Sequence, residues 1–329
     1  MGMLVLDRSH LDVRLDGDAL ALYQDGERRT TVPVALLERV VIQGSRTRLD
    51  SGVLTRLAEE GAAILLLSPR ASRKVALVLG PRHNDATIRM AQSRLACDPD
   101  FCSRWATDIV RAKLRRQHRV LLQAQADRPD VRKPLFDATA TLTLVLRNLS
   151  AHSAPSVESL RGFEGTAARA YFQGLAALFA PALAFSGRNR RPPRDPVNAC
   201  LSLAYTLMHF EAVRAAHVAG LDPLIGFYHR PAYGRESLAS DLIEPLRPTV
   251  DRWIWDRFRD RTFREEHFTR TQGACLLGKA GRERLYSQWE SCARSPRRWL
   301  RQRTLVLARA LRHEGEAWVD HLSDDDIES

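Results

Sequence analysis

Gly80-Pro81-Arg82-His83-Asn84 divides this sequence into two parts with different hydrophobic patterns. Adjacent Gly and Pro are typical of a turn, and the pattern changes at this point from strand-like to helical. Strands followed by helices indicate an α+β protein with more than one domain. We therefore expect a β-rich domain at 1–80, a hinge at 81–88, a helical domain at 89–318 and a disordered acidic tail at 319–329.

Short apolar or alternating stretches fill the part before the hinge, and this pattern is typical of strands. We expect strands at 3–6, 11–15, 19–23, 29–34, 40–42, 63–67 and 74–79. Between the strands expected at 40–42 and 63–67, Leu54, Leu57 and Ala58 follow helical spacing. Gly61 is a plausible end for that helix. The first part is therefore a compact, mostly β unit with one short helix.

The part after the hinge follows the helical period, and over 200 residues belong to it. We expect long helices at 86–97, 101–125, 134–149, 155–180, 196–219 and 296–318. Pro196 directly follows Asp195, and Pro at the first helical position after an acidic cap marks a helix start.

The charge of the chain indicates a polyanionic partner. The 329 residues carry 50 Lys+Arg against 39 Asp+Glu, a net charge of +11. Residues 1–80 contribute +1 and the remainder +10, so the basic excess lies in the helical part. Lys occurs only at 74, 113, 133 and 279; the other cations are Arg, which suits phosphate contacts, although a GC-rich genome gives the same bias.

Composition excludes several protein classes. A hydrophobic share of 44% and a charged share of 27% are those of a globular chain. We see neither an apolar run long enough to span a membrane nor an N-terminal leader, so we expect a cytoplasmic protein without membrane contact. The five Cys are scattered without a CxxC pair, which predicts free buried thiols.

A first candidate site surrounds Glu164 in the stretch 161–172. In a helix, Glu164 shares one face with Ala168 and Tyr171, and that face is otherwise core-like. A buried carboxylate needs a partner, and Gly165 beside it costs about 1 kcal/mol of helix propensity relative to Ala. A close backbone, a metal ion or a phosphate would explain both residues, while an exposed Glu at a helix edge is the other interpretation.

A second candidate is an Arg-rich loop at 186–198. Its Gly and Pro residues prevent a helical face, so we expect the Arg side chains to project from a stiffened loop. Such a loop suits contacts with a phosphate backbone, and a solvated basic loop is the alternative. The candidates for DNA binding are Arg188, Arg190, Arg191 and Arg194.

A third candidate lies between Gly220 and Pro245. Ser237 or Ser240 can cap a short helix on which Asp241 and Glu244 lie side by side at i, i+3. Two adjacent carboxylates repel unless a cation lies between them, and His229 is near enough in sequence to converge with them. Two carboxylates and a His favour a divalent-metal site over a structural role.

Other reaction classes lack their motifs. We find no P-loop, GxGxxG, GxSxG or HExxH pattern, which argues against nucleotide-fuelled and serine-nucleophile chemistry. The remaining His residues are isolated or share a face only loosely, which indicates surface or packing roles.

Taken in order, the three candidates resemble the CRISPR-associated endonuclease and integrase of the spacer-acquisition module, the Cas-one family. The resemblance covers nearly the whole chain. It rests on Glu164-Gly165 with Ala168 and Tyr171, Gly187-Arg188, Pro192-Pro193, Asp195-Pro196 and Asn198, Gly220-Leu221-Asp222-Pro223, Gly226 through His229, Ser237-Leu238, Asp241-Leu242, Glu244-Pro245, and Arg247 through Asp251.

The resemblance implies a fold and a metal centre. The fold is a small N-terminal β-sandwich-like domain followed by a larger all-α catalytic domain, with a homodimer formed through the β domains. The catalytic residues are Glu164, His229, Glu244 and Asp241. Mn²⁺ or Mg²⁺ is held by Glu164, His229 and Glu244, and Asp241 is the auxiliary acid. Many family members have Asp at the position of Glu244, so Asp241 remains a second candidate for the third ligand.

The resemblance also implies an activity and partners. A protospacer is inserted into a CRISPR array when its 3′-hydroxyl attacks a phosphodiester of the repeat. The partners are double-stranded DNA and a small Cas-two protein that bridges two integrase dimers. A metal-dependent endonuclease or junction-cleaving repair enzyme that uses water has the same site and is an alternative. A non-catalytic DNA-binding scaffold, with the acids only pairing to Arg, is a second alternative.

Overall fold

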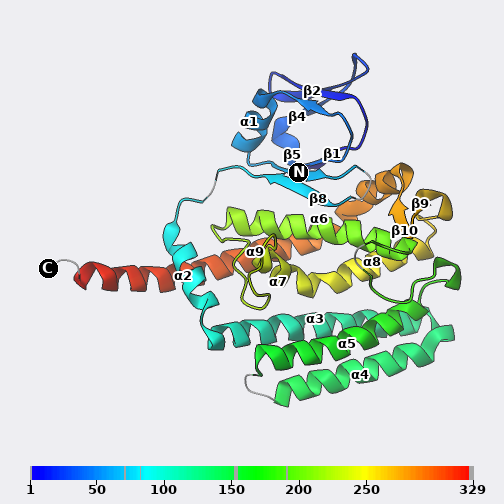
Figure 1. The fold of residues 1–329 in the computed structure, drawn as a ribbon, viewed down its shortest axis with the longest axis vertical. Coiled ribbons are helices and arrows are strands. Elements are labelled where there is room, and N and C mark those ends of the chain that lie inside the picture. The colour runs from blue at the N-terminus through cyan, green and yellow to red at the C-terminus, as the bar shows by residue number, and fades with distance from the viewer. Residues whose placement is uncertain (1, 70–71, 82, 152–154, 190–191, 326–329) are drawn as a thin grey trace. The chain divides into compact units, whose positions relative to one another are not determined.

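The computed structural model describes residues 2–69, 72–81, 83–151, 155–189 and 192–325 (Figure 1). Two compact units divide the chain. Unit 1 contains Met1–His83 and Gly278–Ser287, and unit 2 contains Asn84–Leu277 and Gln288–Ser329. The chain is thus a mixed α/β protein with strands in its N-terminal part and helices in most of the remainder, as the sequence predicts.

Unit 1 contains two four-stranded sheets. Their strands are β1 (Gly2–Leu6), β2 (Leu11–Asp16), β3 (Ala19–Gln24), β4 (Glu27–Pro33), β5 (Leu37–Ile42), β6 (Arg48–Leu49), β7 (Ala63–Leu67) and β8 (Lys74–Val78). One sheet has the order β1-β5-β7-β8, in which only the β7–β8 pair is antiparallel. The other has the order β4-β3-β2-β6, and β2 and β3 form a hairpin whose turn needs the positive φ of Gly17.

One hydrophobic core joins both sheets and the short helix α1 (Ser51–Glu59). Val13 of β2, Val40 of β5 and Leu57 of α1 are all buried in it. The side chains that fill this core come from alternating stretches such as β2 and from continuous apolar stretches such as β7, and both patterns are visible in the sequence. The sequence does not predict the two-residue strand β6, because it is too short to carry a pattern. Gln43 and Asp7 at its edge bond to Tyr286 and Arg282, so the first part of the last helix belongs to this unit.

Unit 2 is built mainly from long helices. They are α2 (Ala86–Ala96), α3 (Pro99–Asp127), α4 (Arg132–Ala151), α5 (Val157–Ala177), α6 (Pro196–Val218), α7 (Ser237–Ile243), α8 (Arg247–Arg259) and the part of α9 (Lys279–Asp325) that follows Ser287. This unit also has single turns of 3-10 helix at Pro129–Val131, Pro181–Leu183, Glu244–Leu246 (η4) and Glu265–His267, and a further one, Val34–Leu36, lies in unit 1. The carboxylate of Asp195 caps α6 by accepting from the backbone N–H of Asn198, so the predicted Asp195-Pro196 start is confirmed.

Three of these helices, α3, α4 and α5, lie side by side (Figure 1). They meet at Gly174 of α5, where a Cβ atom would lie 2.8 Å from the Cβ of Ala138 on α4. It would also lie 3.4 Å from Leu121 on α3. Only Gly allows this approach, and it brings α5 with Glu164 against α3.

The expectation that the second domain is all-α is wrong. Strands β9 (Phe268–Thr271) and β10 (Ala274–Leu277) form an antiparallel hairpin within unit 2. Gln272 and Gly273 both have positive φ in its turn, as a two-residue hairpin turn requires. Strands of four residues carry too little alternating pattern to stand out in the sequence.

Two predicted boundaries of the second part also need correction. Pro296 lies inside α9, which begins at Lys279, whereas the sequence suggested a helix start at Pro296. The same helix continues through Asp325, so residues 319–325 of the expected disordered tail are helical. No Gly or Pro interrupts 319–325, and an established helix extends at little cost until a breaker stops it.

The predicted state of the thiols is confirmed in part. All five Cys are free, but only Cys200, Cys275 and Cys292 are buried, whereas Cys97 is exposed and Cys102 is partly buried. In the ranges that the structure describes, no helix combines the length and the apolar character needed to cross a membrane.

The close approach at Gly174 gives a prediction for stability. We expect Gly174→Ala to lower the free energy of unfolding by about 1–3 kcal/mol, because the overpacking against Ala138 outweighs the better helix propensity of Ala. Gly162→Ala on the same helix is the control, since its Cβ meets nothing within 4 Å, and it should stabilise by up to about 1 kcal/mol. Urea unfolding followed by circular dichroism measures both. Equal effects of the two substitutions would contradict the packing.

Candidate active site

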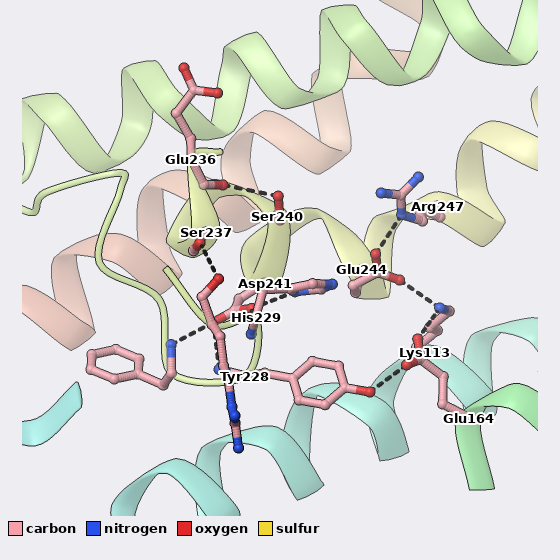
Figure 2. A network of polar contacts seen from close by, with 12 residues as sticks. Lys113, Glu164, Tyr228, His229, Glu236, Ser237, Ser240, Asp241, Glu244 and Arg247 are labelled. Carbon is pink, nitrogen blue, oxygen red and sulfur yellow. Dashed lines mark hydrogen bonds and ion pairs between the residues drawn. The ribbon is translucent and has the colours of Figure 1, made fainter. Parts of the chain in front are cut away.

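Two carboxylates from separate elements meet on one cation, the ammonium of Lys113. Lys113 Nζ on α3 donates to Glu164 Oε1 of α5 at 2.5 Å and to Glu244 Oε2 of η4 at 2.6 Å (Figure 2). The Glu244 side chain is 5% exposed, that of Lys113 11% and that of Glu164 20%. The predicted partner of Glu164 therefore exists, and it is another side chain of this protein.

The other two carboxylate oxygens also accept hydrogen bonds. Tyr228 donates its hydroxyl hydrogen to Glu164 Oε2, and Arg247 Nε donates to Glu244 Oε1 at 2.8 Å (Figure 2). Burial alone would raise the pKa of Glu244, but the charges of Arg247 and Lys113 outweigh it and hold that pKa well below its usual range. Glu244 is thus a charged carboxylate in a buried place, held by two cations.

Asp241 has a different role from Glu244. Its two oxygens accept from the backbone N–H groups of Phe227, Tyr228 and His229 at 2.8–3.0 Å. Asp241 Oδ1 also lies 2.7 Å from His229 Nδ1. Because an ionised carboxylate only accepts, this contact assigns the ring proton to Nδ1 and leaves Nε2 as the free nitrogen. Asp241 therefore orients the histidine and the loop before it.

The prediction that Asp241 and Glu244 pair around one cation is wrong. Helix α7 ends at Ile243, and Glu244 begins the following 3-10 turn. From there the two carboxylates reach different partners, Asp241 the backbone of the 227–229 loop and Glu244 the Lys113 ammonium. The prediction that Ser237 or Ser240 caps α7 is wrong. The N-cap residue is Glu236, whose side chain makes no capping hydrogen bond, and Ser237 and Ser240 both lie inside the helix.

The loop that carries His229 is held from two sides. At Gly226 a Cβ would lie 2.6 Å from the backbone carbon of Ser237, so only Gly lets the loop pass this close to α7. On the other side, Gln92 Nε2 of α2 donates to the carbonyl oxygens of Asp222 and Ile225 at 2.9 and 2.7 Å. These contacts explain why a turn rich in Gly and Pro has a defined conformation here.

Gly165 has no comparable packing reason. A Cβ at Gly165 would meet nothing within 4 Å, so a close protein backbone does not account for this residue. Gly165 is exposed, and nothing in the packing of the described residues explains it.

The Arg-rich loop is described only in part. Arg190 and Arg191 lie outside the described residues, and Arg194 is exposed. Arg188 instead contacts protein groups, because it donates to Asn198 Oδ1 at 2.6 Å and to Ser202 Oγ at 3.1 Å. Its guanidinium lies over the ring of Tyr205, 5.3 Å from the centroid.

A buried network connects this loop to Glu244. The guanidinium of Arg247, which holds Glu244, lies 4.7 Å from the centroid of Tyr205, a ring that Arg188 also covers. The hydroxyl of Tyr205 donates to Asp251 Oδ1, and that of Tyr171 donates to Asp251 Oδ2 at 2.9 Å. Tyr171 is therefore a packing residue that bonds to Asp251, as its helical position suggested. Burial raises the pKa of Asp251 to about 6, although both hydroxyls oppose the shift.

Sequence reasoning missed several residues of the site. Lys113 and Gln92 contact it and lie outside every motif quoted above. Tyr228 and Arg247 lie in stretches that carry the family resemblance, but the sequence predicts no role for them there. The one available signal is that Lys113 is among only four Lys in a chain whose other cations are Arg.

The donor set suits a divalent cation in chemistry but is not assembled as one group. Glu164 and Glu244 supply oxygens around a single cation, and Nε2 of His229 is the free ring nitrogen. Among the residues that the structure describes, however, no three His, Cys, Asp or Glu side chains form a cluster that could hold a metal ion. The position between the two carboxylates is taken by Lys113.

Comparison with known proteins identifies relatives along most of the chain. Residues 4–291 match the family described as CRISPR associated protein Cas1. A relative from Thermodesulfovibrio yellowstonii, named CRISPR-associated endonuclease Cas1 1, is 34% identical over 294 residues, which are 88% of this chain and 91% of the relative.

Solved structures share the fold. A casposase bound to an integration product superposes with a TM-score of 0.82 at 21% identity, over 95% of this chain and 91% of the casposase. A chain of a Cas6-RT-Cas1–Cas2 complex has a TM-score of 0.80 at 24% identity, over 95% of this chain and 35% of that longer chain. At these identities the likeness establishes the architecture.

The raised pKa of Asp251 predicts a pH dependence of stability. The carboxyl has a pKa of about 6 in the folded protein against 3.8 in the unfolded chain, so the folded protein retains a proton between these values. The stability that this proton contributes is present below about pH 4 and is lost as the pH rises through 6. The difference in unfolding free energy between the unsubstituted chain and Asp251→Asn should therefore fall by up to about 3 kcal/mol from pH 4 to 7. Urea unfolding at several pH values measures it, and a rising difference would contradict the assignment.

Proposed function

The chain belongs to the CRISPR-associated Cas1 family, and from this premise we propose that it is a metal-dependent DNA integrase and endonuclease. Its reaction inserts a protospacer into a CRISPR array when the donor 3′-hydroxyl attacks a repeat phosphodiester. The observation that carries the proposal is the convergence of Glu164 and Glu244 on one cation, 2.5 and 2.6 Å from their oxygens. The curated relative is itself named an endonuclease, and the casposase of the same fold is bound to an integration product.

Mn²⁺ or Mg²⁺ would be held by Glu164, Glu244 and Nε2 of His229. When bound, the cation supplies charge neutralisation at the phosphate and at the leaving oxygen. Asp241 fits a positioning role better than a ligand role, because each of its oxygens already accepts two hydrogen bonds. Carboxylates that orient a ligating His in this way are a regular part of metal sites. We therefore assign the third ligand to Glu244.

The attacking group comes from DNA in this proposal. Tyr228 donates to Glu164, and burial raises the pKa of its hydroxyl far above its usual value, so it is a poor nucleophile. Tyr171 is fully buried against Asp251 and is out of reach of a substrate. A 3′-hydroxyl held beside the carboxylates needs no covalent protein–DNA intermediate.

DNA would be held through its backbone by the basic excess of residues 81–329. Arg194 is exposed for a phosphate contact, and Arg190 and Arg191 are proposed for the same role. Arg188 would act mainly by fixing the loop, since its guanidinium is held by Asn198 and Ser202. Contacts of this kind carry no base information, so recognition would depend on DNA shape, strand ends and partners.

The proposed assembly contains a second copy of this chain and a Cas2 protein. The β-rich residues 1–80 would form the homodimer contact, and Cas2 would bridge two dimers. A structure of similar fold occurs in a Cas1–Cas2 complex, which supports the Cas2 partner. An endonuclease that uses water remains the alternative, because the same carboxylates could serve either nucleophile.

The joining reaction tests these assignments. We expect Glu164→Gln and Glu244→Gln to abolish the joining of a 3′-hydroxyl donor to a repeat-containing target in Mn²⁺, because each removes one charged ligand. Asp241→Asn should retain joining at a rate about 10–100-fold lower, since it only misorients His229. Glu158→Gln is the matched control, because that exposed Glu lies on the same helix as Glu164 and forms an ion pair with the exposed Arg230.

Labelled oligonucleotides on denaturing gels resolve the joined product from simple cleavage. DNA affinity by gel shift in chelator should be similar for all four variants, because it depends on many phosphate contacts. Full joining by Glu244→Gln together with none by Asp241→Asn would reverse the assignment of the third ligand. Cleavage without joining would favour the water-dependent alternative. Equal joining of a 3′-phosphate donor would contradict attack by the donor 3′-hydroxyl. Unchanged activity in chelator would reject a metal enzyme.

A further inference from the structure

We propose that Lys113 is an internal counter-cation that holds the place of the divalent ion between Glu164 and Glu244 and leaves this place when the ion binds. The inference rests on the proposed function, because it concerns how the same site takes up its metal. It assigns a role to a residue of α3 that stands far from Glu164 and Glu244 in the sequence.

The geometry of the donors leads to this proposal. Each of the four oxygens of Glu164 and Glu244 accepts a hydrogen bond, from Lys113, Tyr228 or Arg247. Tyr228 and Arg247 each reach one carboxylate. Among the donors that the structure describes, Lys113 alone reaches both, so its ammonium marks the point from which one cation contacts the two carboxylates. A divalent ion that binds both must take that point, and the ammonium must give it up.

The type of residue supports a place-holding role. Only four of the 50 cationic residues are Lys, and one of them lies at this buried point. An ammonium is a compact charge that can lie between two oxygens and then withdraw on a flexible four-carbon chain. A guanidinium is planar and broad, and it prefers a two-pronged contact with one carboxylate. Lys113 could therefore leave the site without a movement of α3.

The arrangement also explains how the ion-free protein tolerates its own site. Glu244 is almost fully buried, and two carboxylates that share a point repel each other strongly without a cation. Lys113 supplies that charge before the metal arrives. The consequence is that metal binding replaces one cation by another, so the affinity for the ion is lower than the carboxylates alone would give.

Amine labelling of the unsubstituted protein tests the exchange directly. With four lysines in the chain, mass spectrometry after brief treatment with acetic anhydride can quantify each one. We expect acetylation of Lys113 to be slow without metal and to rise by at least about tenfold in Mn²⁺ or Mg²⁺ as the ammonium is released. Lys133 is the internal reference, because its side chain is 87% exposed and its labelling should not change. Labelling of Lys113 that stays slow although calorimetry shows metal bound would overturn the proposal.

A variant gives the second measurement. Lys113→Met should bind Mn²⁺ at least about tenfold more tightly by calorimetry, because no ammonium has to be displaced, and a tenfold change is 1.4 kcal/mol. Arg116→Met is the matched control for lost positive charge. Arg116 lies one turn further along α3 and donates to the backbone oxygen of Pro245, so we expect less than about a twofold change.

The outcomes separate this inference from the proposed function. Equal tightening by both variants would mean that general charge, and not displacement, weakens metal binding, and it would overturn the inference alone. Metal binding by Lys113→Met but not by the unsubstituted chain would show that the ammonium blocks the site and is not displaced, and it would overturn the exchange. No metal binding by either protein would refute the proposed metal enzyme and the inference with it. If Lys113→Met does not fold, the labelling result on the unsubstituted protein decides.

Discussion

The contact of Lys113 with Glu164 and Glu244 is the interaction on which the rest of the site depends. The two carboxylates come from elements far apart in the sequence. Without a cation between them, the free-energy cost of burying both negative charges would be too high for a stable fold. Removing one partner of such a buried pair typically costs about 3–5 kcal/mol. The packing of α3 against α5 and η4 is therefore coupled to the charge balance of the site. The close approach at Gly174 supports the same contact, because it lets α5, which carries Glu164, pack against α3, which carries Lys113.

Asp241 and Glu244 look equivalent in the sequence, but they have different roles in the structure. Asp241 and Glu244 are three positions apart, but one organises the His229 loop through four N–H contacts and the other meets the cation. Arg247 then ties Glu244 to Tyr205, whose ring Arg188 also covers. The basic loop and the carboxylate pair thus share one set of supporting contacts, so a change in the loop can reach the site without touching it.

What the sequence predicts well is what depends on neighbours along the chain. Most strands of unit 1 follow from alternation or from short apolar runs, and the start of α6 follows from Asp195 and Pro196, because these signals are local. The role of Lys113 cannot be seen this way, since it depends on which helices pack together. The sequence does not predict helix α8, because its many Arg and Asp residues weaken the apolar period. It also places the start of α9 too late, because Pro296 is tolerated inside this long helix.

We propose that Glu164 and Glu244 together form the cation site and that Asp241 only positions His229. A crystal of this chain grown with Mn²⁺, and measured for anomalous scattering, tests it most directly. We expect one strong anomalous peak within coordination distance of both glutamates and of Nε2 of His229, with the Lys113 ammonium withdrawn. A peak coordinated by Asp241 would contradict it, and so would a fully loaded crystal in which Lys113 still bridges the two carboxylates.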